Sequence, residues 1–160
     1  MTIFTIGYEG RSINEFLATL KDYGVNTVVD VRELPLSRKR GFYKTSLANN
    51  LSEIGIGYVH WASLGYPKDI RNRYRQDQDW QRYTVGFLKY LKTQKRAISE
   101  LALLASAKNC ALLCYEADFN FCHRSMVAHA VSIVGSMAVE HITASDTRSE
   151  KVASIRRAAA

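Results

Sequence analysis

Short runs of apolar and β-branched residues alternate along the chain with segments in which apolar residues recur every three to four positions. Each run has the length of a buried strand, and each intervening segment has the periodicity of a helix. The expected strands are residues 2–6, 25–31, 56–61, 110–115 and 137–142. The expected helices are residues 13–23, 46–54, 80–107 (with a break near Thr93) and 122–134. This order predicts an α/β fold, a single three-layer domain with a mostly parallel sheet of about five strands and helices on both faces.

Local signals support this assignment. Ser12 with Glu15 three residues later forms a capping box, which marks a helix start after the first strand. The run CALLCY (residues 110–115) is apolar throughout, as expected for a strand covered on both faces. Residues 32–43 and 62–79 carry charged residues and a proline each, and we predict loops there.

The length of 160 residues suits one domain with its own core. We expect the domain to occupy residues 1–145, followed by a polar tail, helical or frayed, over 146–160. The start, MTIFTIGYEGRS, lacks the pattern of a secretory signal, and no stretch approaches the roughly 18 apolar residues of a membrane helix. Three cysteines, an odd number, favour reduced thiols. We therefore expect a cytoplasmic protein without a membrane partner.

Chemically distinctive residues follow the ends of the predicted strands. Gly7 and Tyr8 follow the first strand, Asp30 and Arg32 close the second, and the fourth runs into Cys114 and Glu116. In open α/β sheets, ligands bind outside the carboxyl ends of the strands. The agreement between strand pattern and polar residues predicts a functional site at that edge of the sheet.

The segment CYEADFNFCHR (residues 114–124) leaves a buried strand and enters a helix through Cys122, His123 and Arg124. A helix start attracts anions and lowers the pKa of a nearby thiol, and Arg124 adds positive charge. Cys114 and Cys122 are therefore candidate nucleophiles, and His123 and Glu116 are candidate proton carriers. The alternative is that both cysteines are small core residues and Arg124 is a solvated helix cation.

Spacing argues against a metal site formed by Cys114, Cys122 and His123. Zinc sites favour closely spaced pairs, whereas these cysteines are eight positions apart and Cys122 adjoins His123. These three residues remain the candidates if a metal is bound, with Glu116 or His60 completing the set. We predict no metal and no cofactor.

Asp30 and Arg32 share one face of their strand, because side chains alternate. Burying them is costly unless they pair with each other or meet a ligand. We count Asp30 with the catalytic candidates, since it would orient Arg32 toward a ligand. Ser37 and Arg38 would extend the phosphate-binding surface.

The turn after the first strand, GYEG (residues 7–10), resembles a phosphate-cradling turn. It lacks a nucleotide-binding glycine fingerprint, however, and glycines that merely permit a tight turn are the alternative.

The net charge of +7 favours a phosphorylated small molecule or a nucleic acid as partner. The cations concentrate in residues 32–44 and 68–75, and aromatic residues are interleaved with them. Such rings offer stacking surfaces for bases, and exposed ones are compatible with a homodimer. Solvated surface charge is the alternative explanation.

Four blocks, TIGYEGRS (5–12), VDVRELPLSR (29–38), YVHWASLG (58–65) and CYEADFNFCHR (114–124), resemble the bacterial and archaeal family called domain of unknown function 488. The resemblance implies one compact α/β domain and supplies no activity. It places signature positions at Gly7, Asp30, Arg32, Pro35, Ser37, Arg38, Gly65, Cys114, Glu116, Cys122, His123 and Arg124. One departure is Tyr66-Pro67, where the family pattern has a second glycine.

The favoured functional hypothesis is an enzyme acting on a phosphorylated ligand, a nucleotide or nucleic acid, with Arg32, Arg38 and Arg124 binding phosphate. The first alternative is a non-catalytic nucleic-acid-binding module with structural cysteines. The second is a metal-binding enzyme or regulator that uses cysteine and histidine.

Overall fold

The computed structural model describes residues 1–143 and 156–159. Its strands are β1 (Thr2–Gly7), β2 (Thr27–Asp30), β3 (Gly57–His60), β4 (Cys110–Cys114) and β5 (Ala138–Ile142). Its helices are α1 (Ile13–Asp22), α2 (Lys44–Glu53), α3 (Lys68–Asp77), α4 (Trp80–Leu91), α5 (Lys95–Ala107) and α6 (His123–Gly135). Short 3-10 turns cover Ala62–Leu64, Lys92–Gln94 and Phe119–Phe121.

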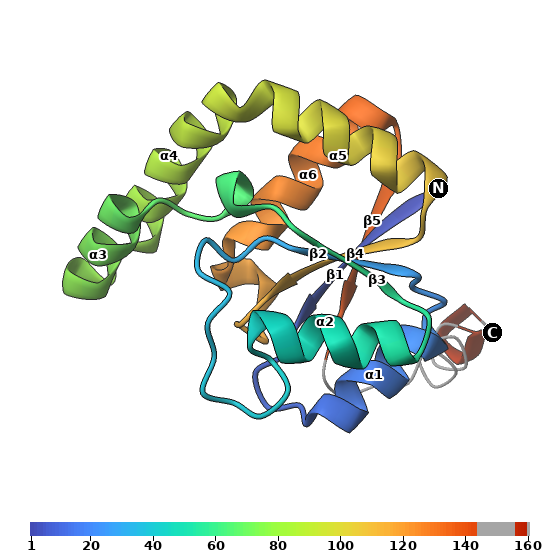
Figure 1. Ribbon diagram of the computed structural model, residues 1–160. Coiled ribbons are helices and arrows are strands. Elements are labelled where there is room, and N and C mark those ends of the chain that lie inside the picture. Colours follow the sequence, from blue (N-terminus) through green and yellow to red (C-terminus); the bar gives the residue numbers. More distant parts are fainter. Residues whose placement is uncertain (144–155, 160) are drawn as a thin grey trace.

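The five strands form one sheet in the order β3-β2-β4-β1-β5, and every neighbouring pair is parallel. Helices α1 and α2 cover one face, whereas α4, α5 and α6 cover the other (Figure 1). The predicted three-layer α/β domain is therefore confirmed. Because β4 lies between β1 and β2, the tips of these three strands are adjacent at the carboxyl edge.

Two cores hold the layers together. On one face, Phe16 and Leu20 of α1 and Leu47 and Leu51 of α2 are buried against the sheet. On the other face, α4, α5 and α6 pack against the strand side chains that point to that face, such as Leu112. Central strands β2 and β4 are buried at every position, as a strand covered on both faces must be.

The predicted details of the helices mostly hold. Ser12 and Glu15 form the capping box reciprocally at the start of α1. The segment 80–107 is two helices separated by the turn Lys92–Gln94, and the Thr93 hydroxyl donates to Tyr90 O at the break (2.6 Å).

The prediction of a loop over residues 62–79 is wrong for its second half, which forms α3. The segment is so polar that its helical period is weak. Its few apolar side chains are nevertheless spaced four apart, and Tyr74 packs its ring against Trp80 and Tyr83 of α4 (5.8 and 5.1 Å between centroids). This tertiary contact stabilises a helix that propensity alone does not predict.

The predicted tail, residues 146–160, lies outside the described residues except for 156–159, which are helical and exposed. Among the described helices, none combines the length and apolar character that crossing a membrane requires.

Candidate functional site

A hollow of about 570 Å³ lies at the carboxyl edge of the sheet, where β1, β2 and β4 end. Volumes of roughly 300–1,000 Å³ are typical of small-molecule sites. The hollow lies where the crossover connections of neighbouring strands leave to opposite faces, the usual ligand position in such sheets. Its lining is Tyr8, Arg32, Glu33, Leu34, Leu36, Tyr66, Arg71, Tyr74, Arg75, Gln78, Cys114, Tyr115, Glu116 and His123.

The lining includes five of the residues predicted from sequence: Tyr8, Arg32, Cys114, Glu116 and His123. They come from the ends of three different strands and from the first turn of α6. The ends of β1, β2 and β4 therefore lie together around one hollow, as predicted.

Asp30 and Arg32 form a buried ion pair beside the hollow. Arg32 Nε donates to Asp30 Oδ1 (2.8 Å) and Arg32 Nη2 to Asp30 Oδ2 (2.7 Å). The remaining nitrogen, Nη1, donates to Phe42 O (2.8 Å). Tyr58 donates its hydroxyl proton to Asp30 as well (2.6 Å). Arg32 is only 6% exposed and most of its donors are used, so the pair is mainly an anchor for the loop after β2.

Gly7 permits a close approach between β1 and the loop after β4. A Cβ at this position would lie 1.9 Å from Glu116 O, which no ordinary contact allows. Gly7 does not line the hollow, and its backbone instead brings the Glu116 loop against the end of β1.

Four side chains form a cluster at the hollow. Cys114, Glu116 and His123 belong to its lining, and Cys122 lies next to them outside the lining. The Cys114 thiol donates to Glu116 Oε2 (3.1 Å). His123 Nδ1 lies 3.7 Å from Cys114 Sγ and 3.9 Å from Cys122 Sγ. Both cysteines and the histidine are buried, and all three cysteines of the chain, Cys110 included, are free thiols.

The position of the His123 ring is set by its surroundings. Its Nε2–H donates to Val31 O (2.8 Å), which directs Nδ1 toward the two sulfur atoms. The rings of Tyr66 and Phe87 pack edge-on against it, with centroids 4.8 and 5.4 Å away. A rigid imidazole nitrogen thus faces both thiols.

The environment shifts the pKa values of the cluster in opposite directions. The interaction with Cys122, together with burial, raises the pKa of Cys114 well above its usual value. Burial opposes charge on Cys122 as well, but its interactions with Cys114 and His123 outweigh burial and lower the pKa of Cys122. Burial alone would lower the pKa of His123, yet its bond to Cys122 raises it. Burial is also the largest cause of the raised pKa of Glu116.

Arg124 lies beneath the cluster and is fully buried. Its guanidinium donates to the backbone carbonyls of Glu116 and Ala117. Arg124 is therefore at the same end of the sheet as Arg32, as expected, but it points into the interior and holds the Glu116 loop. It does not line the hollow.

Ser37 and Arg38 are also absent from the lining. Ser37 Oγ accepts from Lys39 N–H within its own loop (3.1 Å), and Arg38 is exposed. Lys39 of this loop donates to Tyr8 O (3.0 Å), so the loop covers the turn after β1.

Helix α3 contributes residues that were not among the predicted site residues. Arg71, Tyr74 and Arg75 line the hollow, and Arg71 Nη1 lies 3.0 Å from Glu33 Oε2. The concentration of cations in residues 68–75 was the available signal, but it did not predict which of these side chains face the hollow. Only the helical winding of α3 decides which arginines face the hollow.

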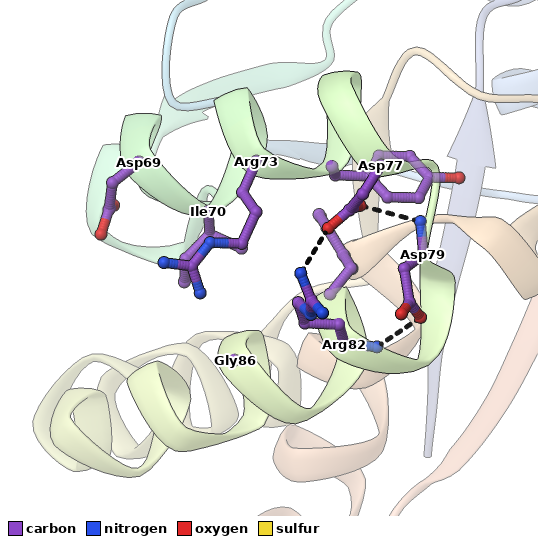
Figure 2. Close-up of a pocket in the computed structure, with 9 residues that line it drawn as sticks. Asp69, Ile70, Arg73, Asp77, Asp79, Arg82 and Gly86 are labelled. Carbon is purple, nitrogen blue, oxygen red and sulfur yellow. Dashed lines mark hydrogen bonds and ion pairs between the residues drawn. The ribbon is translucent and has the colours of Figure 1, made fainter.

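A second, smaller cavity of about 80 Å³ separates α3 from α4 (Figure 2). Arg82 there pairs with Asp77 (3.0 Å), and Asp79 caps α4 by accepting from Arg82 N–H (3.0 Å). The cavity is small and these charged groups serve the helix junction, so we do not regard it as the functional site. Arg73 lines this cavity and is not part of the lining of the larger hollow (Figure 2).

Three residues offer atoms that could hold a metal ion. Cys114 Sγ, Cys122 Sγ and His123 Nδ1 all lie within 4.8 Å of one another. The linear spacing of these residues argued against a metal site, but the fold brings the end of β4 and the start of α6 together, so the three side chains are close in space.

No curated protein and no solved structure matches this chain. The family model described as "Domain of unknown function DUF488" matches residues 12–131, which is most of the chain and includes the Asp30–Arg32 pair and the cysteine–histidine cluster. The chain therefore belongs to the DUF488 family.

Proposed function

We propose that this protein is an enzyme that binds a phosphorylated ligand, a nucleotide or part of a nucleic acid, in the hollow and acts on it through Cys114, Glu116 and His123. The observation that carries the proposal is that guanidinium groups and this reactive cluster line the same hollow.

The cations on α3 support anion binding. Arg75 has no carboxylate partner among the described residues, so its charge is available to a ligand. Arg71 lines the same hollow, where its guanidinium also pairs with Glu33 (3.0 Å), and an arginine in such a position can bind a phosphate oxygen. We therefore assign phosphate binding to Arg71 and Arg75, and we assign to Arg32 a role in holding the rim.

The rings around the hollow support a ligand with a base. Tyr8, Tyr66, Tyr74 and Tyr115 contribute to the lining. Tyr115 is about half exposed, and a flat ring of this kind is a stacking surface for a nucleobase. Cys114, Glu116 and His123 supply a thiol, a carboxylate and an imidazole, which is more chemistry than passive binding requires.

Replacing Arg75 by alanine is expected to weaken binding of ADP or pyrophosphate about tenfold, which corresponds to roughly 1.4 kcal/mol. The cause is the loss of a charge that faces the hollow. Isothermal titration calorimetry measures the effect. Arg73→Ala is the matched control, because it removes the same charge from the same helix but on the side of the small cavity; it should leave affinity unchanged. Equal losses in both variants would contradict the proposal.

Replacing Cys114 by serine is expected to abolish turnover of a ligand identified in this way while changing its affinity less than about threefold. Cys114 belongs to the cluster at which we place the reaction, whereas the arginines hold the phosphate. Cys110→Ala is the control, since Cys110 lies at the opposite end of β4. A different outcome is that the protein binds a short single-stranded oligonucleotide but converts neither this oligonucleotide nor any nucleotide. That result would support the non-catalytic nucleic-acid-binding module instead.

A further inference from the structure

The cluster of Cys114, Cys122 and His123 has the dimensions of a metal site. Zinc bonds of about 2.3 Å to sulfur and about 2.0–2.1 Å to nitrogen, in a tetrahedron, separate sulfur and nitrogen ligands by about 3.6 Å. The two observed separations from His123 Nδ1 to the sulfur atoms are 3.7 and 3.9 Å. The two sulfur atoms lie within 4.8 Å of each other, against about 3.8 Å in such a tetrahedron, so binding an ion draws them together by up to about 1 Å.

The histidine is oriented as metal-binding histidines are. A ligating imidazole normally donates its other N–H to a carbonyl or carboxylate, which sets the tautomer and the ring direction. His123 Nε2 donates to Val31 O (2.8 Å), and Nδ1 faces the sulfur atoms. Burial alone also requires a partner for this N–H, so the feature specific to a metal site is that Nδ1 faces both sulfur atoms.

Glu116 could supply a fourth ligand from the side of the hollow. Glu116 Oε2 lies 3.1 Å from Cys114 Sγ, and its loop is held by Arg124 through backbone carbonyls. Cys114, Glu116 and His123 line the hollow, whereas Cys122 lies behind them and lines a separate cavity beside Trp80. Three protein ligands with a fourth position open to a ligand cavity are typical of catalytic rather than structural zinc sites.

We propose that Cys114, Cys122 and His123 bind one thiophilic divalent cation, Zn²⁺ by preference, with Glu116 or a water molecule in the fourth position toward the hollow. Two thiolates and an imidazole favour zinc over the hard cations Mg²⁺ and Ca²⁺, which take oxygen ligands. The role of the ion in acting on a ligand rests on the proposed function, but its binding does not.

Cobalt is the probe that tests the geometry. The full-length chain is reduced, freed of metal with a chelator and titrated with Co²⁺ alone. We expect one equivalent to produce sulfur-to-cobalt charge-transfer absorption and the intense visible bands of a tetrahedral complex. We expect one equivalent of Zn²⁺ to displace it. Weak octahedral bands without sulfur charge transfer in the unaltered protein would overturn the proposal, and this result requires no variant to fold.

Variants assign the ligands. Cys122→Ser and His123→Ala are each expected to weaken Zn²⁺ binding at least a hundredfold in competition with a chromophoric chelator, while Cys110→Ala retains it within about twofold. Circular dichroism confirms that each variant is folded. Full affinity in folded Cys122→Ser and His123→Ala would overturn the assignment.

Failure of the metal site and failure of the proposed function are distinguishable. Metal binding is measured without any anion, and the Arg75→Ala comparison is made with an anion in metal-free protein. A tetrahedral cobalt complex without ADP or pyrophosphate binding would uphold the metal site and contradict the proposed function. Anion binding without a sulfur-ligated metal would do the reverse.

Discussion

Replacing Asp30 by alanine is expected to lower the free energy of unfolding by about 3–5 kcal/mol, the usual effect of removing one partner from a buried ion pair. Asp30 is fully buried, and its two oxygens accept from Arg32 and Tyr58. The substitution leaves the Arg32 charge buried without its counterion and leaves the Tyr58 hydroxyl without its acceptor. Urea denaturation followed by circular dichroism measures the loss.

Glu100→Ala is the matched control for this prediction. Arg96 and Glu100 form an ion pair of similar length (2.8 Å), but both side chains are exposed on α5. Exposed pairs contribute little, because water and salt screen them. We expect this variant to unfold at the same urea concentration as the unaltered protein. If Asp30→Ala also unfolds at the urea concentration of the unaltered protein, the Asp30–Arg32 pair does not anchor the loop after β2.

Replacing Gly7 by alanine is expected to cost about 3 kcal/mol of stability, at the upper end of what an added methyl group costs in a packed interior. The new Cβ would overlap Glu116 O, and the neighbouring Ala117 N lies only 3.1 Å from it. Both are backbone atoms, which cannot rotate away as a side chain can. The Glu116 loop must therefore move, which also disturbs the cluster that the loop supports.

Gly57→Ala tests whether the cost comes from this overlap rather than from any alanine in a strand. A Cβ at Gly57, in the edge strand β3, would meet its nearest neighbour at 3.6 Å, an ordinary contact. We expect its thermal midpoint to change little while that of Gly7→Ala falls by several degrees. Similar midpoints for the two variants would show that the Glu116 loop adapts freely.

Much of the fold followed from the sequence, because hydrophobic period is a local property. The apolar run of β4 predicted a strand covered on both faces, and Ser12 with Glu15 predicted the start of α1. The rule that parallel sheets bind ligands at their carboxyl edge then predicted that Tyr8, Arg32 and Cys114 would lie together, as they do.

The direction of each side chain was not predictable in this way. Arg32 follows the end of β2 and Arg124 lies in the first turn of α6, but Arg32 is held by Asp30 at the rim while Arg124 points inward to backbone carbonyls. The arginines that do face the hollow, Arg71 and Arg75, belong to α3, whose polar sequence conceals its helical period. Their placement depends on how Tyr74 packs against α4.

The sequence by itself determined the succession of strands and helices along the chain, because hydrophobic period is a local property. It also determined the edge of the sheet at which polar residues collect, because these residues follow the ends of parallel strands. Only the tertiary structure decided that the side chains of Cys114, Cys122 and His123 lie close together. The cysteines are eight positions apart along the chain, and this spacing argued against binding of one metal ion by both. The difference comes from the connection between β4 and α6, which brings the two sulfur atoms and the imidazole nitrogen to within 4.8 Å of one another.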